Sequence, residues 1–215
     1  MRQGSEQIRA GFDASTSRTL HLAVVSGAGN AFMGLGKIIS GVLGLSVFAC
    51  VNGFYTVCMA FARLSAAGGA ARAGAEGLSR RFAFGAGAML FVASILYLMY
   101  AGWSYFHPTV SHYPKYIAIA IATFTFVEIG LNIKSLVQTR KSTSAAAKAI
   151  RVIGVATSVI TLALTQEAIL SFQGAGHDPS VNAFVRLLTG GIAALLGLYV
   201  ITRTRPGVPE GNGWD

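Results

Sequence analysis

Charge is scarce in this sequence. Only 12% of its 215 residues are Asp, Glu, Lys or Arg, whereas 53% are hydrophobic. An ordinary soluble domain carries about 25% charged residues. A chain with so few charges could not cover itself with polar surface in water, so the composition argues against a soluble domain built around one large core.

Cysteines and catalytic motifs are also few or missing. Cys50 and Cys58 are eight residues apart in one apolar stretch, which is about 12 Å along a helix and too far for a mutual disulfide. The sequence has no zinc-ligand spacing, no nucleotide-binding glycine loop, no nucleophile elbow and no zinc-protease helix motif. We therefore expect neither an enzyme nor a bound cofactor.

Long apolar runs dominate the sequence instead. A run of about 18 or more apolar residues with few charges predicts a membrane-spanning helix. The first run is closed by Arg63, and the five runs cover residues 38–62, 82–103, 116–137, 150–172 and 181–201. Backbone amides in lipid must be satisfied within the chain, and the runs lack the alternation of a membrane β-barrel. We therefore predict an all-α fold, a polytopic helical transmembrane bundle.

Two polar stretches indicate where helices start. Asp178 before Pro179 is typical of an N-cap followed by the first helical position, so we expect the last helix to begin there. Residues 142–144 precede an alanine run and predict the start of the fourth helix, ahead of its apolar segment. Both signals support the division into spans.

The first 37 residues do not fit this division well. Residues 20–36 are a marginal sixth span, but they contain Gly27, Gly29 and Asn30 and leave almost no room for a turn before Ile38. The alternative is a helix that lies on, or partly in, the membrane, and we favour it. The predicted parts are thus an interfacial N-terminal segment, a bundle and a polar C-terminal tail, at residues 1–37, 38–203 and 204–215.

Lysine and arginine predict the orientation. They gather in the connections 63–81 and 138–151 and in the tail, whereas the connections 104–115 and 173–180 hold only Lys115. Cytoplasmic loops carry such an excess, so we expect a multi-pass cell-membrane protein with its C-terminus in the cytoplasm. Topology and anionic lipid headgroups also explain the net charge of +9 better than a nucleic-acid partner does.

Ionisable side chains inside the predicted spans are the first candidates for chemistry, because burying them in hydrocarbon is costly. Glu167 and Arg186 both lie about 7 to 9 Å below the same membrane face, on consecutive antiparallel helices. We therefore predict a buried ion pair. The pair is either a packing clamp or one wall of a path for an ion or substrate.

Glu128 lies deeper in the membrane, and Asn132 follows it one turn later on the same helix face. Thr161 and Thr165 belong to a threonine ladder, begun by Thr157, on the next span. Together these side chains predict a polar seam that binds a cation or relays protons. The alternative is structural, because threonine hydroxyls often bond their own helix backbone and an asparagine can hold a glutamate neutral.

Four further polar side chains are of the types that bind metal ions. They fall in connections on one predicted side of the membrane: His107, His112, His177 and Asp178. Imidazole and carboxylate bind transition metals, but the spacing matches no compact metal motif. We predict solvated loop residues here and no metal site.

Small residues recur at four-residue intervals in the first and last spans, for example at Gly36 and Ser40 and at Gly190 and Ala194. This spacing lets helix backbones approach closely, so we expect close helix contacts through both spans. The same faces are where other membrane chains could dock.

Two functions are compatible with these features. The first is a channel or carrier for an ion or small solute, as a homo-oligomer, with a pathway lined by Glu128, Asn132, Glu167 and Arg186. The second is a noncatalytic subunit of a larger membrane complex, which docks through its glycine-lined faces and basic connections. We take transport as the working hypothesis, with the lipid bilayer and other membrane subunits as the expected surroundings.

Overall fold

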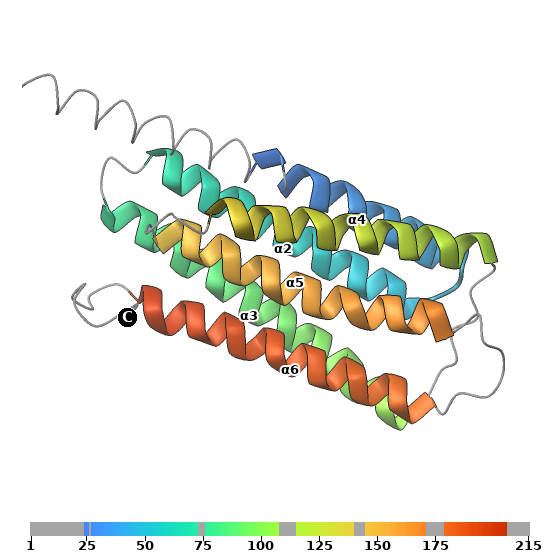
Figure 1. Cartoon of the computed structure of the whole chain (residues 1–215). Helices are drawn as coiled ribbons and strands as arrows, with labels where there is room; N and C mark the ends of the chain where they lie inside the picture. Colours follow the sequence, from blue (N-terminus) through green and yellow to red (C-terminus); the bar gives the residue numbers. More distant parts are fainter. Residues whose placement is uncertain are drawn as a thin grey trace, which may run out of the picture.

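The computed structural model describes residues 24–25, 27–72, 76–107, 115–139, 145–170 and 179–205. These residues form an all-α bundle without strands, as predicted (Figure 1). Its labelled helices are α2 (Val47–Arg72), α3 (Glu76–Phe106), α4 (Lys115–Thr139), α5 (Ala145–Leu170) and α6 (Pro179–Thr204). A further helix over residues 27–43 precedes α2, and we name it the N-terminal helix.

Within the described residues, five helices are long and apolar enough to cross a membrane, which confirms the predicted number of firm spans. Their apolar segments contain 20 to 27 residues, or about 30 to 40 Å at 1.5 Å per residue. Large apolar side chains such as Phe61, Phe126 and Leu195 are more than half exposed on the outside of the bundle. Lipid suits such a surface, and the chain is a multi-pass membrane protein.

The predicted helix starts agree with the structure. α5 begins at Ala145, directly after the 142–144 stretch, and α6 begins at Pro179. The predicted spans in α3, α4 and α6 lie wholly inside those helices. The predicted end of the fourth span, at residues 171–172, lies outside the described residues.

The predicted first span, 38–62, is wrong, because the chain turns within it. The N-terminal helix continues to residue 43, and α2 begins only at Val47. Two bonds close the helix, from Ser46 N to Gly41 O (2.8 Å) and from Leu45 N to Val42 O (3.2 Å), with Leu45 at a left-handed φ of 51°. The room for a turn therefore lies after Ile38, and the predicted boundary at residue 37 falls inside a helix.

Ser46 starts the next helix as it ends the previous one. Its side-chain oxygen accepts a hydrogen bond from Ala49 N at 3.2 Å, the usual role of a serine N-cap. The N-terminal helix and α2 consequently form a tight antiparallel hairpin, and the N-terminal helix also packs along α4 (Figure 1). This position brings its polar residues into the bundle interior.

Helix α5 occupies the centre of the bundle. It packs against α2, α3, α4 and α6, and Figure 1 shows it between α6 and the α2–α4 side. Its buried face carries Ile153, Ile160 and Leu164, which belong to the main hydrophobic core. Any polar residue on that face therefore meets side chains from several helices.

Glycines bring particular helix pairs into backbone contact, as the small-residue spacing predicts. A Cβ at Gly197 of α6 would lie 2.8 Å from backbone atoms of Phe91 in α3. A Cβ at Gly53 of α2 would lie 2.7 Å from the carbonyl oxygen of Gly34 in the N-terminal helix. These glycine faces therefore pack against helices of the same chain.

Two glycines of α6 allow a test of this packing, because one contacts the α3 backbone and the other has open space around it. Gly197→Ala should lower the free energy of unfolding by about 1 to 3 kcal/mol, because the new methyl group overlaps the α3 backbone. Gly191→Ala is the control, since a Cβ there meets nothing within 4 Å and alanine favours helix. Unfolding in mixed detergent micelles, followed by circular dichroism, measures both; equal stability of the two variants would contradict the close contact.

Candidate functional site

A lysine and a glutamate form an ion pair deep inside the bundle. Lys37 Nζ of the N-terminal helix contacts Glu128 Oε2 of α4, and both side chains are 0% exposed. Charged side chains are almost never fully buried unless they are paired. Glu128, predicted from the sequence as an intramembrane polar residue, is therefore held by a partner that the sequence analysis did not assign.

Three hydroxyl and amide groups surround this pair. Lys37 Nζ donates hydrogen bonds to Asn52 Oδ1 (3.1 Å), Thr56 Oγ1 (3.3 Å) and Thr161 Oγ1 (3.3 Å). Thr161 Oγ1 itself donates to Glu128 Oε2 (3.1 Å). We name these five residues, which come from the N-terminal helix, α2, α4 and α5, the Lys37 cluster.

The local sequence explains how α2 takes part. Asn52 and Thr56 are four residues apart and thus lie on one helix face. Asn52 Nδ2 donates to the carbonyl oxygen of Ile160 on α5 (3.2 Å), and Thr56 Oγ1 donates to the carbonyl oxygen of Asn52 (3.0 Å). These bonds fix the two acceptors where Lys37 reaches them.

Glu128 keeps one oxygen free of hydrogen bonds. Its Oε2 receives the bonds from Lys37 and Thr161, whereas its buried Oε1 has no hydrogen-bond partner. An unpaired buried acceptor is costly. A proton or a cation that binds Glu128 would meet this oxygen.

A second polar layer lies one turn from Glu128 along α4. Asn132 Oδ1 accepts a bond from Asn30 Nδ2 (3.2 Å), and Asn132 Nδ2 donates to Ser158 Oγ on α5 (3.0 Å). The asparagine predicted to extend the face of Glu128 thus does so. It makes its contacts with other helices and has no recorded bond to Glu128.

Only one residue of the predicted threonine ladder takes part in the buried polar contacts between helices. Thr161 belongs to the Lys37 cluster. Thr157 and Thr165 instead donate to backbone carbonyl oxygens of their own helix, those of Ile153 (2.7 Å) and Thr161 (3.2 Å). For these two hydroxyls the structural alternative holds.

Arg63 is fully buried, which corrects its predicted place at the surface end of the first span. Helix α2 continues past it to Arg72, and the apolar segment continues to Gly68. Its guanidinium lies against α5, where a Cβ at Gly154 would be 2.9 Å from Arg63 Nη2. None of its three side-chain nitrogens has a hydrogen-bond partner.

The predicted ion pair between Glu167 and Arg186 is present. Arg186 Nη2 and Nε both donate to Glu167 Oε2, the latter at 3.1 Å. Arg186 Nη1 donates to Ser104 Oγ (3.2 Å), and its guanidinium carbon lies 4.1 Å from the ring centre of Phe48. The pair therefore joins α3, α5 and α6 with the first residues of α2.

The residues considered as metal ligands are mostly outside the described ranges. His112, His177 and Asp178 fall there. His107, at the end of α3, stacks on Trp103 with ring centres 5.1 Å apart. Within the described residues, no three His, Cys, Asp or Glu side chains come together in a way that could hold a metal ion.

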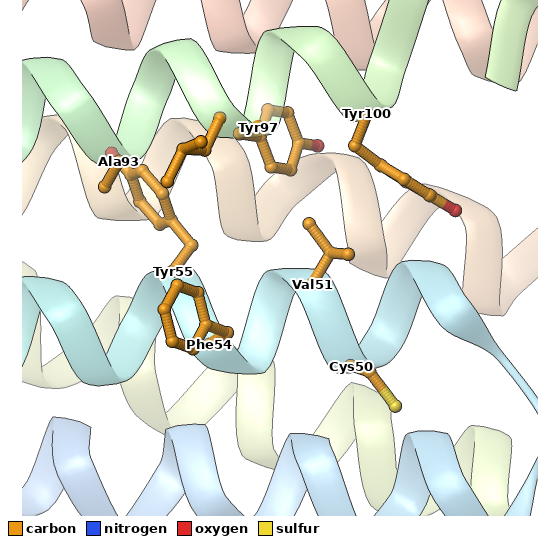
Figure 2. A pocket seen from close by; sticks show the side chains of 8 residues that line it. Cys50, Val51, Phe54, Tyr55, Ala93, Tyr97 and Tyr100 are labelled. Carbon is orange, nitrogen blue, oxygen red and sulfur yellow. The ribbon is translucent and has the colours of Figure 1, made fainter. Parts of the chain in front are cut away.

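An apolar cavity of about 340 Å³ lies between α2 and α3. Figure 2 shows Tyr97 and Tyr100 of α3 facing Val51 and Phe54 of α2 across it. Its walls are mainly carbon, and its lining is Cys50, Val51, Phe54, Tyr55, Ala93, Leu96, Tyr97 and Tyr100. None of the residues of the Lys37 cluster lines this cavity.

Sequence reasoning missed two buried cations, Lys37 and Arg63. Lys37 directly precedes the predicted first span and Arg63 directly follows it, which are positions typical of basic residues that flank a membrane span. One available signal was the apolar neighbourhood of Lys37, which has Leu35 before it and Ile38 and Ile39 after it.

No protein-family model matches the chain, and no curated protein matches it significantly. Any proposal about function must therefore rest on the buried polar layers of the bundle.

Proposed function

We propose that this protein is a channel or carrier that moves an ion or small solute across the membrane by way of the Lys37 cluster. The observation that carries the proposal is the Lys37–Glu128 pair, which is fully buried and held by side chains from four helices. Ionisable groups inside a membrane bundle are costly and commonly mark ion or substrate paths.

The polar layers follow one another along α5, and this supports a path. Three residues of this helix mark them: Glu167, which pairs with Arg186 of α6, Thr161 of the Lys37 cluster, and Gly154 beside Arg63. Glu167 and Gly154 are 13 residues apart, or about 20 Å along the axis. Buried polar groups thus recur through most of the hydrocarbon thickness.

The Lys37–Glu128 ion pair can break when another positive charge binds Glu128, and it can form again when that charge leaves. A proton or cation that reaches Glu128 competes with Lys37 for the carboxylate. Asn52, Thr56 and Thr161 then remain as acceptors for the released ammonium group. Exchange between these two arrangements would couple binding at Glu128 to a movement of the N-terminal helix.

The alternative, a noncatalytic subunit, loses part of its support. Several glycine-lined faces that suggested docking pack within this chain. For example, Gly197 of α6 packs against α3, and Gly53 of α2 packs against the N-terminal helix. A chain with so few spans usually needs further copies or partners to enclose a path, so the proposal includes a homo-oligomer or other membrane subunits. It also retains a cell-membrane location with a cytoplasmic C-terminus.

Flux in liposomes tests the proposal. Purified protein is reconstituted, and proton, potassium and chloride fluxes are followed with entrapped fluorescent indicators. Glu128→Gln should lower the wild-type flux roughly tenfold or more, which corresponds to about 1.4 kcal/mol in the barrier. The matched control is Lys134→Gln, since Lys134 is an exposed charge on the same helix.

Two results would contradict the proposal. One is equal flux through wild type and Glu128→Gln. The other is the absence of flux through the wild-type protein for every ion tested, which together with copurifying membrane chains would establish the subunit alternative.

A further inference from the structure

Arg63 differs from the other buried charges in having neither a hydrogen bond nor a salt bridge from its side chain. Among the described residues, Lys37 pairs with Glu128 and Arg186 pairs with Glu167. Arg63 is 0% exposed, and its Nε, Nη1 and Nη2 atoms all lack a hydrogen-bond partner. A buried guanidinium carries five N–H donors, and leaving them unsatisfied is costly.

The buried charges of the described residues do not balance. The fully or nearly fully buried set contains three cations, Lys37, Arg63 and Arg186, and two carboxylates, Glu128 and Glu167. Glu128 is close enough to interact electrostatically with Arg63, but its recorded hydrogen bonds are to Lys37 and Thr161. One positive charge is therefore left over, at Arg63.

The surroundings of Arg63 restrict what could supply the missing charge. Its Nη2 lies against α5 at Gly154, where even a methyl group would come within 2.9 Å. Such an enclosed position favours an ion of a few atoms over a large anion. A single negative charge would neutralise the set.

We propose that Arg63 binds a small, singly charged anion, such as chloride, nitrate or a short carboxylate, inside the bundle. The guanidinium has the planar donor array that binds such ions. The inference rests on the proposed function, because Arg63 lies beside α5 at Gly154, seven residues from Thr161 of the Lys37 cluster, and an anion held there is the transported species. It deepens that function by naming the class of substrate.

Thermal unfolding in detergent tests the binding directly. The wild-type protein is prepared in sodium gluconate, whose anion is bulky, and chloride, nitrate or acetate replaces gluconate at constant ionic strength. Each small anion should raise the unfolding midpoint by about 3 to 8 °C at a 10- to 100-fold excess over the dissociation constant, and the midpoint should keep rising with the logarithm of the anion concentration. The absence of any such rise in the wild type would overturn the inference.

Variants assign the effect to Arg63. Arg63→Gln should abolish the rise and, in gluconate, should unfold at or above the wild-type midpoint, because it removes an uncompensated buried charge. Lys134→Gln removes one exposed charge and should behave as wild type. An unchanged rise in Arg63→Gln would place the anion elsewhere and overturn the inference.

Arg63→Lys keeps the experiment decisive if the glutamine variant does not fold. Lysine retains the charge but loses the planar array of donors, so the anion concentration that gives the same rise in midpoint should increase about tenfold, most clearly for acetate and nitrate. An identical concentration dependence in wild type and Arg63→Lys would speak against guanidinium binding.

Binding and transport can fail separately. Flux that depends on Glu128 but not on the anion, together with no rise in midpoint, removes the anion site and leaves the proposed function standing. An anion-dependent midpoint that needs Arg63, in a protein without flux, removes the proposed function, and with it the assignment of the anion as the transported species.

Discussion

Replacing Lys37 by methionine should lower the free energy of unfolding by about 3 to 5 kcal/mol, because Glu128 then stays buried without its counter-charge. Methionine keeps the length and apolar stem of lysine, so the loss reports on charge rather than on a cavity. Unfolding in mixed detergent micelles, followed by far-ultraviolet circular dichroism, gives the value. Lys134→Met, at an exposed position on α4, should change stability by less than about 0.5 kcal/mol.

The double variant Lys37→Met with Glu128→Gln completes this prediction. Removing both charges of a buried pair is often neutral or stabilising, so the double variant should recover most of the loss. It should still fail to support flux, because the proposed path then has no ionisable group at its centre. Additive losses from the two single substitutions would show that the two side chains do not act as a pair.

Arg186→Met should cost a similar amount, about 3 to 5 kcal/mol, for a different set of contacts. The substitution strands Glu167, removes the bond to Ser104 Oγ and ends the contact with the ring of Phe48. The same unfolding assay applies. Because three other helices contact this arginine, near-ultraviolet circular dichroism should also report loosened packing around the aromatic residues.

Two comparisons support the reading of this second result. Arg203→Met changes an arginine at the other end of α6, where the side chain is only partly buried, and should cost no more than about 1 kcal/mol. Arg186→Met combined with Glu167→Gln should recover stability, as for the first pair. A double variant as unstable as Arg186→Met alone would mean that the salt bridge itself is not the source of the loss.

The number of spans and their positions within α3, α4 and α6 were predictable, because each is a local property of the sequence. Length and hydropathy over about 20 residues decide whether a helix can cross a membrane. The Glu167–Arg186 pair was predictable for a related reason. Its two depths can be counted from helix ends that the sequence marks, above all the start at Pro179.

The hairpin before α2 was not predictable in the same way. Helices that end in this manner usually have glycine at the residue with left-handed φ, but here that residue is Leu45, and Gly44 precedes it. The apolar run also continues through the turn. Hydropathy therefore joined the end of one helix to the start of the next.

The Lys37 cluster could not be predicted from the sequence, for a physical reason. A basic residue near an apolar run is typical of a membrane-flanking position, and only a tertiary partner reverses that interpretation. The partners of Lys37 lie on three other helices, and Glu128 is 91 residues away in the chain. Arg63 was misplaced on the same grounds, since the sequence indicates neither its burial nor its contact with Gly154.

The chain distance between Lys37 and Glu128 has a consequence for biosynthesis. A ribosome adds about 5 to 20 residues per second, so the lysine emerges roughly 5 to 20 seconds before the glutamate that neutralises it. During that interval the N-terminal helix carries an unpaired cation, and placing an unpaired charge in hydrocarbon is costly. We therefore expect this helix to wait at the headgroups and to enter the bilayer only after α4 has been made.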